Sequence, residues 1–197
     1  MSAPGERWQP LKEVTVFFDR DGTLNPDPGY ISRPEDFELH PGAGTALSRL
    51  NRAGARVIVL TNQSGIGRGK FTLADLRTIH DKLQDLLALH GARLDAIYHC
   101  PHRPDEGCSC RKPATGMAER AIAEHALNRS RMYLVGDQSG DIEMAKRLEA
   151  RSVLVTTGHG SRETLAELSA RGLPPDCVAD CLRGAVDWIF QDANLAR

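Results

Sequence analysis

Two aspartates, separated by one residue, directly follow a short apolar segment near the start of the chain. Residues 14–18 are predicted to form a buried strand, and Asp19 and Asp21 come at its end. Two carboxylates in such a position repel each other unless a cation lies between them. Mg²⁺ prefers oxygen ligands and usually binds phosphate as well, and Gly22 permits a sharp turn with close backbone approach. The stretch therefore predicts a magnesium site for a phosphoryl group. An Asp-x-Asp pair without this context would instead indicate two solvated surface side chains.

Polar residues also follow two later strand-like segments. Residues 57–60 lead into Thr61 and a glycine-rich loop, where a hydroxyl and consecutive backbone N–H groups could hold a phosphoryl group. Residues 132–136 lead into Asp137, with Asp141 four residues further on. Ligands of parallel sheets bind outside the carboxyl ends of the strands. We therefore expect these side chains to line one crevice, although each stretch taken separately would also fit a solvated loop.

Three cysteines and one histidine lie close together in the chain: Cys100, His102, Cys108 and Cys110. Thiolates and an imidazole are ligands that Zn²⁺ prefers in a tetrahedral shell. Four protein ligands leave no open coordination position, so the predicted zinc site is structural; the alternative is a set of unrelated free or buried thiols. The metal would fix the loop that carries the next two residues, Arg111 and Lys112, at the crevice.

The predicted elements alternate between strands and helices. Strands are expected at residues 14–18, 56–60, 96–100, 132–136 and 152–156, with a possible edge strand near 177–179. Helices are expected at residues 45–53, 72–90, 117–127, 142–150 and 162–171, and Thr72 with Asp75 resembles a capping box. This alternation predicts an α/β three-layer sandwich with a mainly parallel, Rossmann-like sheet. We expect one domain over residues 1–197, with residues 1–12 as a flexible N-terminal lead. Short loops leave no room for a large cap domain.

The composition disfavours several classes of function. Of the 197 residues, 41% are hydrophobic and 26% are charged, as in soluble globular proteins, and a net charge of −1 does not favour nucleic acid or anionic lipid. No apolar run reaches the roughly 18 residues that a membrane span needs. The first ten residues lack the apolar centre of a signal peptide. The clustered cysteines indicate a metal in a reducing compartment, so we expect a cytoplasmic protein, and a monomer.

The string Asp-Arg-Asp-Gly-Thr at residues 19–23 resembles the first motif of the haloacid dehalogenase superfamily of phosphatases. The resemblance implies that Asp19 attacks phosphorus and becomes an aspartyl-phosphate, and that Asp21 is the general acid and base. It also implies that Thr61 holds a phosphoryl oxygen and that Lys112 neutralises the phosphoryl charge.

The same resemblance implies a magnesium site. Its ligands would be Asp19, Asp137 and the backbone carbonyl of Asp21. We expect Asp141 to orient Asp137 or Lys112, or to cap the following helix.

The zinc loop and further strings, within a match over about residues 17–160, are similar to the D-glycero-D-manno-heptose 1,7-bisphosphate 7-phosphatases and to their relatives, the histidinol-phosphate phosphatases. The resemblance implies removal of the 7-phosphate of a small phosphorylated sugar, in heptose and lipopolysaccharide biosynthesis. The expected substrate contacts are Asp27, Pro28, Gly29, Tyr30, Thr61, Asn62, Gln63, Ser64, Arg111, Lys112 and Gln138. One position departs from the family pattern: heptose phosphatases usually carry lysine where Gln138 stands, and a neutral amide offers a second phosphate less charge.

Two other functions remain open at this point. The first is a phosphatase for histidinol phosphate or another small phosphomonoester. The second is a non-catalytic sugar-phosphate-binding or zinc-stabilised interaction module, against which the complete set of catalytic residue types argues.

Overall fold

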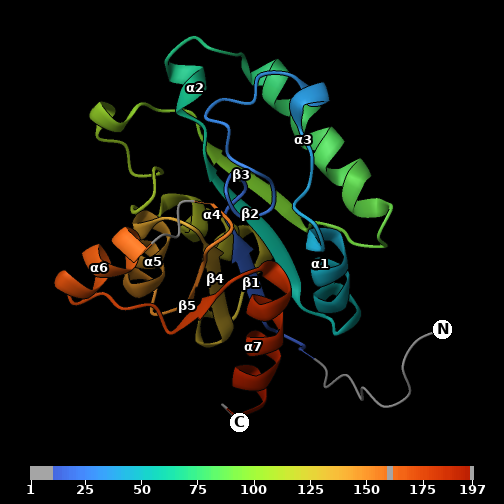
Figure 1. Ribbon diagram of the computed structural model, residues 1–197, viewed down its shortest axis with the longest axis vertical. Coiled ribbons are helices and arrows are strands. Elements are labelled where there is room, and N and C mark those ends of the chain that lie inside the picture. The colour runs from blue at the N-terminus through green and yellow to red at the C-terminus, as the bar shows by residue number, and fades with distance from the viewer. Residues whose placement is uncertain (1–10, 159–161, 196–197) are drawn as a thin grey trace.

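A parallel six-stranded sheet forms the centre of the computed structural model, which describes residues 11–158 and 162–195 (Figure 1). The strands are β1 (Thr15–Phe18), β2 (Arg56–Asn62), β3 (Ala96–Cys100), β4 (Met132–Gly136), β5 (Arg151–Val155) and β6 (Cys177–Ala179). They lie in the order β3-β2-β1-β4-β5-β6, and every pair is parallel. The predicted α/β fold with a parallel sheet is confirmed, and β6 is an edge strand. Residues 1–10 of the predicted N-terminal lead lie outside the described residues.

The helices cover both faces of this sheet. They are α1 (Ala43–Arg52), α2 (Ser64–Gly67), α3 (Leu73–Ala88), α4 (Gly116–His125), α5 (Ser139–Arg147), α6 (Arg162–Ala170) and α7 (Leu182–Leu195). Short 3-10 turns lie at Pro34–Asp36, Pro104–Glu106 and Arg129–Arg131. The five helices predicted from the sequence correspond to α1, α3, α4, α5 and α6. Helix α5 begins three residues before the predicted start, so that Asp141 lies in its first turn rather than before it.

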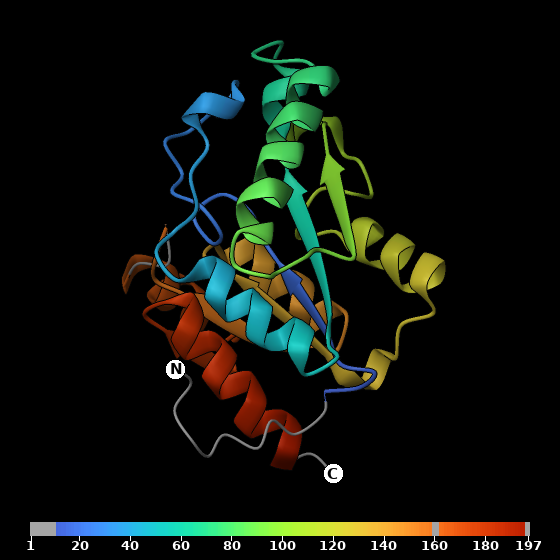
Figure 2. The same cartoon turned by 90° about the vertical axis from the view of Figure 1, so that its right-hand side faces the viewer.

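Successive strand residues enter two separate apolar layers. Val16 and Phe18 of β1 pack with residues of α1, α3 and α7, whereas Phe17 between them packs with residues of α4 and α5. Figure 2 shows α1, α3 and α7 in front of the sheet and α4, in yellow, to the right of it. Because neighbouring strand residues point to opposite faces, a strand covered on both sides must be apolar throughout. This explains why β1 is an unbroken run of buried side chains.

Helix α7 was not predicted from the sequence. Its buried side chains are Leu182, Ala185, Val186, Ile189 and Ala193, and they belong to the same apolar layer as α1. These positions follow the spacing of one helix face. The signal was therefore present in the sequence, in a segment that carries no functional motif. The loop after β2 also contains one short helix, α2, where the sequence predicted only a loop.

The register of the sheet places the end of β1 between β2, which continues three residues further, and the end of β4. Phe18 at the end of β1 pairs with Val59 of β2 on one side and with Val135 of β4 on the other. The backbone N–H of Asp19 continues this register by donating to the carbonyl of Val135 at 2.9 Å. The chain leaves β1 for β2 on one side and returns to β4 on the other, which makes this the switch point where ligands of such sheets bind.

None of the helices among the described residues has both the length and the apolar character needed to cross a membrane.

The start of α3 provides a test of the local structure. The hydroxyl of Thr72 accepts the N–H of Asp75 at 3.1 Å, and the carboxylate of Asp75 accepts the N–H of Thr72 at 2.8 Å, as the predicted capping box requires. We expect Thr72→Ala to lower the free energy of unfolding by about 1 kcal/mol, since an N-cap hydroxyl is lost. Urea denaturation would measure this. Thr45→Ala, at an exposed position inside α1, is the control, and equal stability of the two variants would contradict the capping role.

Candidate active site

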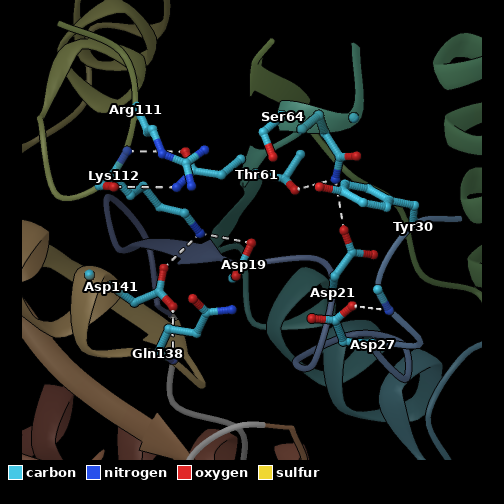
Figure 3. Close-up of a pocket in the computed structure, with 15 residues that line it drawn as sticks. Asp19, Asp21, Asp27, Tyr30, Thr61, Ser64, Arg111, Lys112, Gln138 and Asp141 are labelled. Carbon is cyan, nitrogen blue, oxygen red and sulfur yellow. Dashed lines mark hydrogen bonds and ion pairs between the residues drawn. The ribbon is translucent and has the colours of Figure 1, made fainter. Parts of the chain in front are cut away.

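The carboxyl ends of β1, β2 and β4 open into one cavity of about 380 Å³ (Figure 3). Its lining residues are Asp19, Asp21, Asp27, Gly29, Tyr30, Thr61, Asn62, Gln63, Ser64, Gly65, Arg111, Lys112, Gln138, Gly140 and Asp141. Every residue predicted to contact substrate is therefore at this cavity except Pro28, which does not line it. The structure brings together side chains that are distant in the sequence, as expected for strand ends of a parallel sheet.

Lys112 is a buried cation between two carboxylates. Its Nζ lies 2.7 Å from Oδ1 of Asp19 and 2.6 Å from Oδ1 of Asp141, and all three side chains are buried (Figure 3). Although burial opposes the charge on Lys112, the carboxylates of Asp141 and Asp19 hold its pKa above the usual range. Burial raises the pKa of Asp19 to about 7, while Lys112 favours the ionised form. A further cation beside Asp19 would favour that form as well.

Three buried carboxylates form a group that fits a divalent cation. One oxygen from each of Asp19, Asp137 and Asp141 lies within 4.8 Å of the others. Converging carboxylate oxygens suit a hard cation such as Mg²⁺. The predicted ligands Asp19 and Asp137 are both in this group. The side chain of Asp21 is outside it, so a contribution from Asp21 through its backbone carbonyl stays a prediction.

Asp141 has two of the roles expected for it. One carboxylate oxygen pairs with Lys112, and the other accepts the N–H of Gln138 at 3.1 Å, at the start of α5. The same side chain stands in the acidic group, so Asp141 connects the cation of the loop, the first turn of α5 and the candidate magnesium ligands.

Two glycines leave room for the carboxylate of Asp137. Gly22 has a φ of +80°, and a Cβ atom added there would lie 2.3 Å from Oδ2 of Asp137. A Cβ at Gly158 would lie 2.4 Å from the same oxygen. Thr157 holds the two loops together, because its hydroxyl donates to the carbonyl of Gly22 at 2.7 Å. Gly158 and Thr157 were not singled out from the sequence, since they follow β5, where no acidic motif marks the strand end.

The carboxylate of Asp21 accepts four hydrogen bonds. Arg20 donates from Nε to Oδ1 at 2.9 Å and from Nη2 to Oδ2 at 2.8 Å. Asn25 donates to Oδ1 at 2.9 Å, and Gln63 donates to Oδ2 at 2.7 Å. The candidate acid and base thus lies at the cavity with its position set by three neighbouring side chains.

Two residues at the end of β2 also make contacts within the site that the sequence did not predict. Gln63 joins two catalytic candidates, since its Nε2 also donates to the hydroxyl of Thr61 at 2.8 Å. The amide of Asn62 holds the backbone of Lys112: Nδ2 donates to its carbonyl at 3.3 Å, and Oδ1 accepts its N–H at 3.1 Å. This role of Asn62 was missed, because the two residues are 50 positions apart and no local spacing relates them.

The outer part of the cavity carries the groups expected to contact the sugar. Asp27 accepts the N–H of Gly29 at 2.8 Å, which closes a tight turn before Tyr30, and the Tyr30 side chain is 47% exposed. Nη1 of Arg111 is buried and has no hydrogen-bond partner among the described residues. A buried guanidinium nitrogen without an acceptor at a cavity wall fits an anionic ligand.

The cysteine-histidine group lies beside this cavity and fits zinc. The sulfurs of Cys100, Cys108 and Cys110 are 3.2 to 3.6 Å apart, and Nδ1 of His102 lies 3.5 Å from Cys100 and 3.2 Å from Cys110. Four ligands around a tetrahedral Zn²⁺, with Zn–S bonds of about 2.3 Å, would place sulfurs roughly 3.8 Å apart. Although burial opposes ionisation, hydrogen bonds from the other two thiols lower the pKa of Cys108 to about 7.

Known proteins are similar in sequence to this chain. The profile of the Hydrolase_like family, described as HAD-hydrolase-like, matches residues 109–185. A D-glycero-D-manno-heptose-1,7-bisphosphate 7-phosphatase from Thermosynechococcus vestitus is 42% identical over 190 residues, which are 91% of this chain and 96% of that protein. A D-glycero-beta-D-manno-heptose-1,7-bisphosphate 7-phosphatase from Pseudomonas putida is 46% identical over 149 residues, which are 75% of this chain and 85% of that protein.

A solved structure shares the fold as well. It is the crystal structure of D,D-heptose 1,7-bisphosphate phosphatase from B. bronchiseptica, complexed with magnesium and phosphate. The two structures superpose with a TM-score of 0.83 at 37% sequence identity, covering 91% of this chain and 99% of the other.

The zinc interpretation is testable through Cys108. Cys108→Ala is expected to release most of the bound zinc and to lower the melting temperature, by about 2–4 °C for each kcal/mol lost. Elemental analysis and calorimetry would measure both quantities. Cys177→Ala, which alters a half-buried thiol outside the group, is the matched control and should keep its zinc. Unchanged zinc content and melting in Cys108→Ala would rule out the site.

Proposed function

The chain belongs to the D-glycero-D-manno-heptose-1,7-bisphosphate 7-phosphatase family of haloacid dehalogenase-like hydrolases, and on this premise we propose that it removes the 7-phosphate of that sugar bisphosphate through an aspartyl-phosphate on Asp19. The observation that carries the proposal is the buried contact of Lys112 with Asp19 in a cavity that also exposes Asp21 and Thr61. A nucleophile, an acid and a hydroxyl for the phosphoryl group are thereby within one site.

In the first half-reaction, a carboxylate oxygen of Asp19 forms a bond to phosphorus while the bond to the sugar oxygen breaks. Asp21 donates its proton to the departing sugar oxygen. Lys112 and the hydroxyl of Thr61 offset the charge on the transferring phosphoryl group. Lys112 also acts on the nucleophile. Burial raises the pKa of Asp19, and the charge of Lys112 favours the ionised Asp19 carboxylate that can attack.

In the second half-reaction, water forms a bond to phosphorus and the bond to Asp19 breaks. Asp21 accepts the proton of that water and so returns to its starting state. Mg²⁺, when bound by Asp19, Asp137 and the backbone carbonyl of Asp21, would draw the phosphate to Asp19 and offset negative charge. Asp141 would stay paired with Lys112.

A second candidate substrate class is a monophosphate ester such as histidinol phosphate. The cations that line the cavity are Arg111 and Lys112, and Lys112 is already paired with two carboxylates. Gln138 adds an amide where a charge would bind a second phosphate more strongly. A phosphate-release screen over sugar bisphosphates, sugar monophosphates and histidinol phosphate, with and without EDTA, would decide between the two classes. Absence of Mg²⁺-dependent release from every compound would leave only a non-catalytic binding module.

Several finer features belong to this proposal. We propose a structural zinc ion at Cys100, His102, Cys108 and Cys110, supported by the ligand distances. We propose a single domain, supported by the one sheet that contains all strands of the described residues, and a cytoplasmic location, supported by the clustered cysteine thiols. We also propose a monomer. Size-exclusion chromatography would test the oligomeric state.

Asp19→Asn should abolish turnover, by roughly 10³-fold or more, because the covalent route needs the carboxylate. Phosphate release and circular dichroism would show an inactive but folded protein. Asp36→Asn is the control: this exposed acid pairs with Arg33 and does not line the cavity, so its activity should equal that of the wild type. Substantial turnover by Asp19→Asn would refute the nucleophile assignment.

Asp21→Asn should slow turnover by about 10²-fold or more, the scale of lost general acid and base catalysis. An amide keeps the shape of the side chain but carries no transferable proton. Steady-state kinetics on the best sugar phosphate would measure the loss, with Asp36→Asn again as the control. If the rate is unchanged, Asp21 is not the acid and base.

A further inference from the structure

The hydrogen bonds of Asp21 use the full acceptor capacity of its carboxylate. An ionised carboxyl group has two oxygens with about four lone-pair positions. Oδ1 accepts from Arg20 and Asn25, and Oδ2 accepts from Arg20 and Gln63. An acid and base must exchange a proton through one of these positions. At least one of the four donors therefore has to leave when substrate or water approaches.

The donors differ in how firmly they are held. Arg20 and Asn25 have no exposed surface, and they belong to the same turn as Asp21. The Nδ2 of Asn25 also donates to the carbonyl of Pro26 at 2.7 Å, which fixes its amide. Gln63 also makes a second hydrogen bond, to the hydroxyl of Thr61 at 2.8 Å, but it follows β2, outside this turn, and it lines the cavity together with Thr61. The lone-pair position on Oδ2 that Gln63 occupies is thus the one that faces the cavity. The other hydrogen bonds, from Arg20 and Asn25, hold the carboxylate in place.

Arg20 donates two of the other three hydrogen bonds from a fully buried side chain. The guanidinium faces the ring of Phe37 at 5.8 Å from its centre, and among the described residues it forms an ion pair with Asp21. His80 lies close enough for the two to interact, and burial, with the charge of Arg20, lowers the pKa of His80 to about 3. The histidine is therefore neutral, and Arg20 faces one carboxylate without a competing cationic imidazole.

We propose that Arg20 is a positioning residue for the proton transfers of Asp21. Its two parallel N–H groups fix the plane of the carboxylate and direct one lone pair of Oδ2 into the cavity. In the structure the amide of Gln63 occupies the position that the departing sugar oxygen would take during the reaction. A forked contact of this kind sets direction as well as charge. The inference rests on the proposed function, in which Asp21 protonates the leaving oxygen.

A comparison of leaving groups tests this role. Departure of an alkoxide from a sugar phosphate needs a proton, whereas 4-nitrophenolate leaves readily without one. Arg20→Lys keeps the positive charge but loses the pair of parallel N–H donors that contacts both oxygens of Asp21. We expect kcat/KM for the best alkyl phosphate of the screen to fall by about 10-fold to 100-fold, part of the usual contribution of general acid catalysis. The kcat/KM for 4-nitrophenyl phosphate should change by less than about threefold, because its leaving group needs no proton from Asp21.

The ratio of the two kcat/KM values is insensitive to partial unfolding, because both come from one preparation and the active fraction cancels. Phe37→Leu is the matched control: it alters the same buried surroundings and leaves the fork in place, so the ratio should stay at the wild-type value. If Arg20→Lys does not fold, Arg20→Met, which fills a similar volume without charge, is measured in the same way.

The outcomes separate the inference from the proposed function. A ratio that shifts tenfold or so in the Arg20 variants and not in Phe37→Leu supports the positioning role. A wild type that hydrolyses both compounds, with an unchanged ratio in the Arg20 variants or with none of them folding, overturns the positioning role alone. A wild type that hydrolyses neither compound overturns the proposed function, and the inference with it.

Discussion

The burial of ionised groups at the end of one sheet is the constraint on which the site depends. Lys112, Asp19 and Asp141 are withdrawn from water, and the ammonium group of Lys112 stabilises both carboxylates at 2.6 to 2.7 Å. In a medium of low polarity, a charge that loses its partner is very unfavourable. The loop that carries Lys112 must therefore follow a fixed path. The amide of Asn62 holds its backbone, and the cysteine-histidine group closes the loop just before it.

The order of the strands explains why residues so far apart in the sequence share one cavity. Strand β1 lies at the centre, with β2 on one side and β4 on the other. Because the strands are parallel, the loops that follow them meet at a single edge. Close packing there leaves little freedom for change. The backbone at Gly22 and Gly158 touches the carboxylate of Asp137, and a side chain at either position would occupy the space of that ligand.

The cavity divides into a rigid inner part and an outer part built by loops. The inner part holds the buried acids, Lys112 and the fixed carboxylate of Asp21. The outer part is formed by the turn at Asp27, the exposed ring of Tyr30 and the loop of Arg111. In the proposed function, phosphoryl transfer takes place in the inner part. The choice among phosphate esters would be made in the outer part, where Gln138 and Arg111 would set how much positive charge a second anionic group meets.

The sequence by itself determined the fold class, the nature of the chemistry and most lining residues, because apolar periodicity and strand-end motifs are local signals. It also predicted the four candidate zinc ligands, whose spacing is short and whose atoms converge in the structure. Only the tertiary structure decided that Asn62 holds Lys112, that Asp141 pairs with the same lysine, and that Arg20 is turned inward toward Asp21. Such contacts depend on strand register and on the path of each loop. No pattern within a single segment contains that information.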